Sequence, residues 1–304
     1  MAYETFDAIL QTNGNFLGSF EEFQNNPPVK NGFDITSGVW IGKLPHKTNS
    51  GLIMDACEPA GYNFRPTRQF NCLYAFVRKL ESDQYPSYEW DEDGVLRKII
   101  FLSRLIHPTT ISGQYSARMI FENSELQTVI PGHTQGFGTQ VWIVAEEWRD
   151  WIDTTQAEAL RDFWPRYAAE TAPERVRRAR ARLDHALHNY YLDQRMISLV
   201  SSFESLLKVS QYKSEKQFCL RVSKLAELLG NPITEADALL TYKDRSEIVH
   251  GQGPTWNDVD AELMARYQQF ELILRQALLK ASVEPEFANN FVDDTVIQNV
   301  FGRI

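Results

Sequence analysis

Hydrophobic and polar positions follow two different periods along this 304-residue chain, and the period changes near residue 154. Before that point, short β-favouring runs alternate with turn-rich pieces. The runs are GVWIGKL (38–44), GLIMDA (51–56), QTVI (127–130) and QVWIVAEE (140–147). One stretch, DGVLRKIIFLSRLIH (93–107), has apolar residues at helical spacing and is followed by Pro108 as a stop signal. We therefore predict an α+β domain over residues 1–153.

From residue 154 onward the period is helical. The segment 171–192 opens with Thr171 three residues before Glu174, which is a capping-box pattern. QRMISLVSSFESLLKVS (194–210) carries one continuous apolar stripe, and FCLRVSKLAELLG (218–230) ends on a glycine. Two further helical segments cover 234–251 and 258–281. These features predict an all-α helical bundle over residues 154–281, followed by a C-terminal tail, 282–304, with apolar residues but no clear period.

Composition and charge narrow the class of protein. A hydrophobic content of 43% is enough to build cores. No apolar run is long enough to span a bilayer and the N-terminus lacks a signal-peptide pattern, so we expect a cytoplasmic protein without membrane contact. Three widely spaced cysteines indicate neither a disulfide framework nor a zinc site.

The net charge of −9 argues against a protein that coats nucleic acid by bulk electrostatics, but the charge is uneven. Residues 1–153 carry 12 Lys and Arg against 19 Asp and Glu, whereas residues 154–304 carry 19 against 21. The second half can therefore meet a polyanion with less repulsion than the first.

Motifs for several common chemistries are missing from the sequence. There is no GxxxxGK[ST], GxGxxG or GxSxG motif. His185 and His188 are three residues apart on a predicted helix, but no third ligand stands beside them at a useful spacing. We expect neither a metal nor a cofactor.

An arginine run on the first long helix of the bundle is a candidate RNA-binding surface. Arg175, Arg178 and Arg182 fall on one helix face, and guanidinium groups match phosphate geometry. The interpretation that we favour is a solvated helix surface, or one docked on the acidic first half.

The segment LLTYKDRSEIVHGQG (239–253) holds a candidate catalytic pair, Arg245 and His250. RNA is cut without a metal when its 2′-hydroxyl attacks the adjacent phosphate, which requires a proton-transfer group and a fixed positive charge. Histidine and arginine supply these.

The spacing of this pair is weak support, because such a spacing is expected by chance in a chain with 20 arginines and six histidines. On an ideal helix the two side chains stand roughly 140° apart, so the helix must end near the histidine for both to reach one phosphate. Gly251 follows His250 at once, which predicts such an end.

The segment YKDRSEIVHG resembles the signature of the HEPN superfamily, in the Apea-like form, in which an arginine precedes a histidine by a short interval. The helix ISLVSSFESLLK is similar to a helix of the family that carries an acidic residue, here Glu204, and RVSKLAELLG between them is also family-like. The resemblance covers about residues 175–280 and implies a HEPN-like bundle.

The resemblance also implies a function. Active HEPN proteins are metal-independent endoribonucleases that work as homodimers and leave 2′,3′-cyclic phosphate and 5′-hydroxyl ends. Carried onto this chain, Arg245 holds the phosphate and His250 transfers protons, with Glu204, Ser246 and Tyr242 in supporting positions. Ser246 departs from the Asn, Asp or His frequent in the superfamily, and the His-x-Tyr ending of some HEPN toxins is missing.

We therefore expect an anti-phage defence or toxin-like nuclease that cleaves cellular RNA, either tRNA or mRNA. The first domain is then a sensor or a substrate-selection domain, and an unidentified trigger or inhibitory partner controls the nuclease. Two alternatives stay open: a catalytically inactive module that binds RNA or nucleotide, and a dimerisation scaffold for the first domain.

Overall fold

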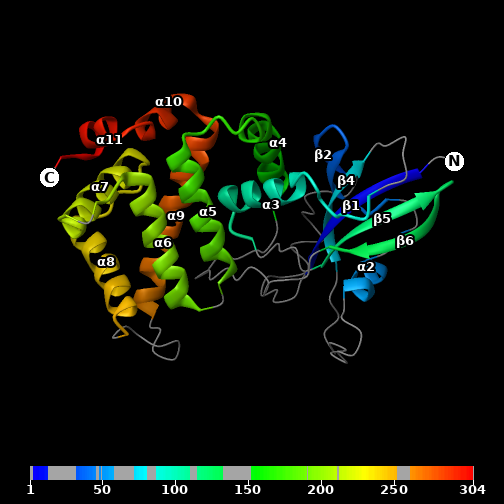
Figure 1. The fold of residues 1–304 in the computed structure, drawn as a ribbon, viewed down its shortest axis with the longest axis horizontal. Helices are drawn as coiled ribbons and strands as arrows, with labels where there is room; N and C mark the ends of the chain where they lie inside the picture. The colour runs from blue at the N-terminus through cyan, green and yellow to red at the C-terminus, as the bar shows by residue number, and fades with distance from the viewer. Residues whose placement is uncertain are drawn as a thin grey trace. The chain divides into compact units, whose positions relative to one another are not determined.

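The protein, described here by a computed structural model, separates into two compact units, one built around a β-sheet and one made of helices (Figure 1). The structure describes residues 3–12, 32–45, 48, 50–57, 72–80, 87–109, 115–132, 152–189, 191–210, 212–251 and 261–303. Among these residues the first unit runs to Pro165 and the second begins at Arg166. The predicted order, an α+β part followed by a helical part, is confirmed.

Within the described ranges, the first unit holds an antiparallel sheet of six strands in the order β2-β3-β4-β1-β5-β6. The strands are β1 (Tyr3–Thr12), β2 (Phe33–Thr36), β3 (Val39–Gly42), β4 (Cys72–Leu80), β5 (Ser116–Glu122) and β6 (Glu125–Pro131). Two helices belong to the same unit, α2 (Ser50–Cys57) and α3 (Val95–Ile106). The long strands β1 and β4 form the centre of the sheet.

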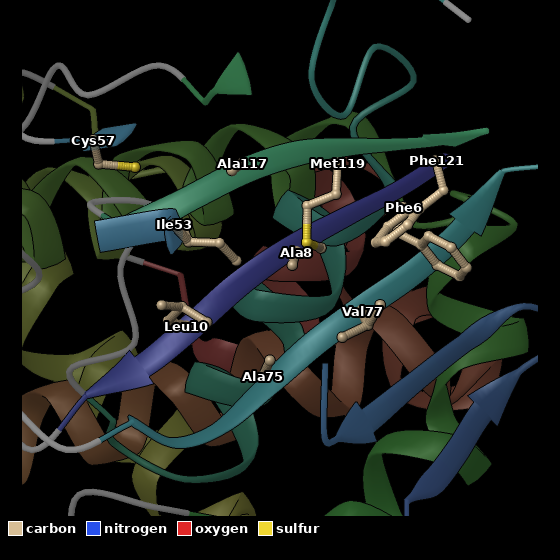
Figure 2. Close-up of a cluster of buried hydrophobic side chains, with 10 residues drawn as sticks. All are labelled: Phe6, Ala8, Leu10, Ile53, Cys57, Ala75, Val77, Ala117, Met119 and Phe121. Atoms are coloured by element: carbon tan, nitrogen blue, oxygen red, sulfur yellow. The ribbon is translucent and has the colours of Figure 1, made fainter. Parts of the chain in front are cut away.

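One face of this sheet carries the apolar cluster drawn in Figure 2. Alternate residues of β1, β4 and β5 point toward it, because successive side chains of a strand lie on opposite faces. Ile53 of α2 packs against them, and the rings of Phe6 and Phe121 meet edge to face with centroids 5.6 Å apart. The cluster comprises Phe6, Ala8, Leu10, Ile53, Cys57, Ala75, Val77, Ala117, Met119 and Phe121.

The opposite face of the sheet buries an ion pair. Asp7 of β1 lies directly across from Arg118 of β5. Both carboxylate oxygens of Asp7 accept hydrogen bonds of 2.7 Å from the guanidinium group of Arg118. The side chains are 0% and 4% exposed. The backbone N–H of Asp91 donates to the same carboxylate, and the Asp91 side chain accepts from the N–H of Leu96 in the first turn of α3. This polar group therefore attaches the start of α3 to the sheet.

The second unit is a bundle of helices. Helix α4 (Thr154–Ala168) begins in the first unit and ends in the second, so the division falls inside a helix rather than at the predicted boundary of 153/154. The remaining helices are α5 (Glu174–His188), α6 (Leu192–Leu207), α7 (Ser214–Leu228), α8 (Glu235–Val249), α9 (Ala261–Val283), α10 (Pro285–Ala288), the 3-10 turn η3 (Asn289–Phe291) and α11 (Asp294–Phe301). Helix α6 packs between α5 and α8 (Figure 1). In the described part of the chain, no helix is long and apolar enough to cross a bilayer.

The apolar stripe predicted on α6 forms the centre of the bundle. The Phe203 ring is fully buried and meets Phe218 of α7 and Phe270 of α9 edge to face, with both centroid distances 6.1 Å. Arg195, also fully buried, donates from Nε to the carbonyl of Asn189, at the C-terminal end of α5. This bond fixes the connection between α5 and α6, because unpaired carbonyls at a buried helix end are costly.

The C-terminal segment, for which the sequence indicated no period, folds into α10, η3 and α11 and completes the bundle. Its aromatic residues Phe291 and Phe301 are fully buried and stack with centroids 5.5 Å apart. Asp294 of α11 accepts a hydrogen bond of 2.6 Å from Arg175 and lies 3.0 Å from Lys208 Nζ. The hydrogen bond from Lys208 is the main cause that lowers the Asp294 pKa.

Two local predictions were wrong. The run GLIMDA is helical, within α2, because Ile53 and Cys57 stand one turn apart and cover the sheet together. The capping box predicted for Thr171 does not form, since α5 begins after Pro173 without a side-chain cap. The runs 38–44, 93–107 and 127–130 overlap β3, α3 and β6 as predicted. The run 140–147 lies outside the described residues.

Candidate functional site

Helix α8 carries both residues of the candidate pair. The helix begins with a capping box, in which Thr234 Oγ1 accepts from the backbone N–H of Asp237 at 3.1 Å. It ends where Gly251 adopts φ +71°, a left-handed conformation that favours glycine. Within α8 the buried residues are Ala238 and Thr241, so most of its surface is accessible. The helix end predicted next to His250 is confirmed.

Two contacts fix the orientation of α8. Asp244 accepts hydrogen bonds of 3.2 and 3.0 Å from Arg266 of α9. The ring of Tyr242 packs on Phe218 of α7, with centroids 5.1 Å apart. Tyr242 therefore acts in packing, and Asp244 attaches α8 to α9. The sequence did not reveal the role of Asp244, because its partner is distant along the chain and no local pattern marks it.

Arg245 is a half-buried arginine with unfilled hydrogen-bonding capacity. Its side chain is 26% exposed, and its Nη2 lies 3.9 Å from Oε2 of Glu204 on α6. That distance is an ion pair without a hydrogen bond. The Nε–H is buried and donates to no acceptor in the described part of the chain. An arginine in this state can accept an anion without first giving up a strong bond.

Glu204 is the carboxylate of the site. Its side chain is 21% exposed, and its burial raises the pKa, while the charges of Arg245 and Arg182 act in the opposite direction. Burial disfavours the charged form because it removes water from the carboxylate. The structure thus places Glu204 beside Arg245, at 3.9 Å.

His250 occupies the C-terminal cap of α8. Its backbone N–H donates to the carbonyl of Ser246 at 3.1 Å, and its side chain is exposed. The side chain makes no hydrogen bond or ion pair with any described residue. The histidine is therefore open to a ligand.

No hydrogen bond or ion pair joins the described side chains of Arg245 and His250 within one chain. The backbone at His250 has φ −87° and ψ 4°, outside the α-helical range, so the regular helix ends at Val249. Ser246 is half-buried and contributes its carbonyl to the cap of the helix. One copy of α8 therefore presents an arginine toward α6 and a histidine to solvent.

The three arginines predicted as an RNA-binding face have different partners. Arg175 donates to Asp294, and Arg178 donates to Glu174 one turn earlier. Arg182 donates from Nη1 to the carbonyl of Ser201 on α6, at 2.7 Å. Of the three, Arg182 alone is among the groups whose charge acts on Glu204.

The two histidines of α5 have partners within the bundle. His185 Nδ1 lies 3.2 Å from Oγ of Ser198, and His188 Nδ1 lies 2.7 Å from the carbonyl of Asp184. Among the residues that the structure describes, no group of three or more His, Cys, Asp and Glu side chains is placed to hold a metal ion.

Comparison of the chain with protein-family models, with curated proteins and with solved structures found no match. The resemblance to the HEPN superfamily therefore rests on the residues of the chain itself, and the function is argued from the chemistry of the site.

Proposed function

We propose that the protein is a metal-independent endoribonuclease with Arg245 and His250 as its catalytic residues. One observation carries the proposal. Within one helical segment, a half-buried arginine retains an unused Nε–H, and an exposed histidine stands at a glycine-terminated helix end. A fixed positive charge and a free imidazole are the two groups that cleavage of RNA by its own 2′-hydroxyl requires.

In the proposed reaction the 2′-oxygen of RNA forms a bond to the adjacent phosphorus, and the bond from phosphorus to the 5′-oxygen of the next nucleotide breaks. His250 accepts the 2′-hydroxyl proton and then donates a proton to the leaving 5′-oxygen. Arg245 binds the phosphate oxygens and stabilises the negative charge that they gain in the transition state. The products carry 2′,3′-cyclic phosphate and 5′-hydroxyl ends.

We propose that two copies of the chain complete the site. On an ideal helix a five-residue step leaves two side chains about 140° apart, and α8 is helical through Val249, so we infer that one copy does not present Arg245 and His250 to the same phosphate. A second copy supplies the missing partner. Leu240 and Val249 of α8 are 44% and 49% exposed, and burying such side chains in a dimer interface is favourable.

The biological setting follows from the family resemblance of residues 175–280. We propose that the target is cellular RNA, tRNA or mRNA, and that the protein acts in the cytoplasm as an anti-phage defence or toxin-like effector. The sheet unit then senses a trigger or selects the RNA.

The test is cleavage of cellular RNA by the purified full-length protein in the presence of EDTA. We expect cleavage by the wild type and a loss of at least a hundredfold in Arg245→Ala and His250→Ala, in line with removal of a charge-stabilising or proton-transfer group. His188→Ala is the matched control, because His188 also lies in the last turn of a helix. Full activity of both catalytic variants would refute the proposal.

Mixing the two inactive variants tests the shared site. A dimer of one Arg245→Ala chain and one His250→Ala chain retains one site with an arginine from one copy and a histidine from the other. Activity should therefore reappear on mixing and remain undetectable in each variant alone. No recovery, with mixed dimers demonstrated by mass spectrometry, contradicts a site built from two copies.

A binding module is the second candidate function, and one observation favours it: Glu204 already lies beside Arg245 and partly neutralises it. Such a module binds RNA without cutting it. Tight binding of RNA by the wild type with no new RNA ends in any cellular pool selects this function.

A further inference from the structure

Two arginines whose charges act on the same carboxylate come from the two helices that flank α6 (Figure 1). Arg245 of α8 lies 3.9 Å from Glu204. Arg182 of α5 is bound to the carbonyl of Ser201, one turn before Glu204 on the same helix, and its charge also acts on that carboxylate. The three charged groups therefore come from three neighbouring helices, with Arg182 bound one turn before Glu204 and Arg245 beside it.

These three side chains offer more hydrogen-bond donors than acceptors. The Arg245 side chain makes no hydrogen bond to any described residue, and its Nε–H is buried. Arg182 uses Nη1 for one backbone carbonyl, and a guanidinium group carries five N–H donors. Glu204 is held only by the loose ion pair, since no hydrogen bond to its side chain joins it to the described residues. Two positive charges thus share one weakly held negative charge.

A phosphodiester satisfies this arrangement better than Glu204 does. It carries one negative charge on two oxygens, which match the paired N–H groups of a guanidinium. The Glu204 side chain is 21% exposed, so it has a path toward solvent. We propose that Glu204 is an internal counter-ion that an RNA phosphodiester displaces, so that Arg182 and Arg245 bind one backbone phosphate together. This inference rests on the proposed function for its ligand, and it assigns Arg182 a role that Arg175 and Arg178 do not share.

The two possible roles of Glu204 predict opposite effects on the affinity for RNA. If Glu204 serves to orient Arg245, its loss weakens RNA binding. If Glu204 competes with the phosphate, its neutralisation strengthens binding. Two unit charges about 4 Å apart interact by about 1 kcal/mol in water, which corresponds to about a fivefold change in affinity. Glu204→Gln keeps the shape of the side chain and removes the charge.

The experiment measures binding of a fluorescein-labelled, single-stranded 2′-O-methyl RNA to the full-length protein by anisotropy, at several salt concentrations. This RNA lacks the 2′-hydroxyl and is not cleaved. We expect Glu204→Gln to bind about fivefold more tightly than the wild type. Arg182→Gln should bind several-fold more weakly, with a salt slope reduced by about 0.7, the value for one phosphate contact on a single strand. Arg177→Gln is the matched control, because Arg177 is exposed on another face of α5.

Unchanged or weaker binding by Glu204→Gln, with a wild-type circular dichroism spectrum, would overturn the inference. Equal losses in Arg182→Gln and Arg177→Gln would also overturn it, since they indicate diffuse attraction. So would a failure of the wild type to bind the RNA. The proposed nuclease fails separately, if natural RNA is bound with the predicted pattern but never cut.

Discussion

The buried ion pair between Asp7 and Arg118 allows a stability prediction in which the size of the effect follows from the structure. In Asp7→Asn, the side chain keeps its shape but loses its charge. Arg118, 4% exposed, then keeps a positive charge that has little contact with water. Removing one partner of a buried pair destabilises a protein by about 3–5 kcal/mol. We expect the lower end, about 3 kcal/mol, because Arg118 also donates to the carbonyl of Ser87 at 2.8 Å.

The ion pair of Arg78 and Asp93 is the matched control. It lies in the same unit and is also bidentate, but its side chains are 18% and 53% exposed. Water replaces a lost partner there, so Asp93→Asn should cost at most about 1 kcal/mol. The contrast between the two variants isolates burial as the cause.

The assay is hydrogen exchange in increasing urea, read by mass spectrometry on separate peptides of β1 and α6. With a urea dependence of about 2 kcal/mol per molar, a loss of 3 kcal/mol lowers the midpoint of the β1 peptide by about 1.5 M. The α6 peptide belongs to the other unit and should keep its midpoint. A β1 midpoint equal to that of the wild type, or an equal shift in Asp93→Asn, would refute the reasoning.

Three further predictions concern the helical unit. Phe203→Ala should lower the free energy of unfolding by about 3–5 kcal/mol in urea titrations, because it opens a cavity at the centre of the bundle; a loss below 1 kcal/mol would contradict that position. Gly251→Ala should cost about 1 kcal/mol by the same measurement, since φ +71° is unfavourable for alanine and no neighbouring atom obstructs its methyl group. The pKa of Asp294 is lowered in the folded protein. Its ion pairs therefore stabilise α11 at pH values above the ordinary aspartate pKa, and this stabilisation is lost as the pH falls through the lowered pKa. The protection of the α11 amides, taken relative to their intrinsic exchange rates at each pH, should therefore fall in acid for the wild type and depend less on pH in Asp294→Asn.

The helices of the second unit were predictable because their apolar spacing coincides with their buried faces. The apolar stripe predicted helix α6 and its buried face, and the glycine after His250 predicted the end of α8. The central strands were harder to predict. β1 and β5 are buried on both faces, so the apolar residues Ile9 and Ile120 on the second face interrupt the apolar/polar alternation that marks a half-buried strand. On that face Asp7 lies opposite Arg118. Each residue is compatible with burial only when the other is opposite to it.

Part of the candidate site was also predictable from the sequence. A helix end and an ordered family resemblance marked Arg245, His250 and Glu204. The difference between Arg182 and the other two arginines of α5 was not predictable, because it depends on which arginine contacts α6 and which contacts α11. That distinction arises from the packing of helices that are far apart in the chain.

The position of α11 also has a consequence for the time at which the bundle folds. The buried rings of Phe291 and Phe301 close the bundle, and Arg221 of α7 donates to the carbonyls of both Leu207, at the end of α6, and Gly302, just after α11. During synthesis the bundle cannot close until these residues have left the ribosome. The helical unit therefore closes only after α11 has been made, so its folding follows the synthesis of the other helices that the structure describes in this unit.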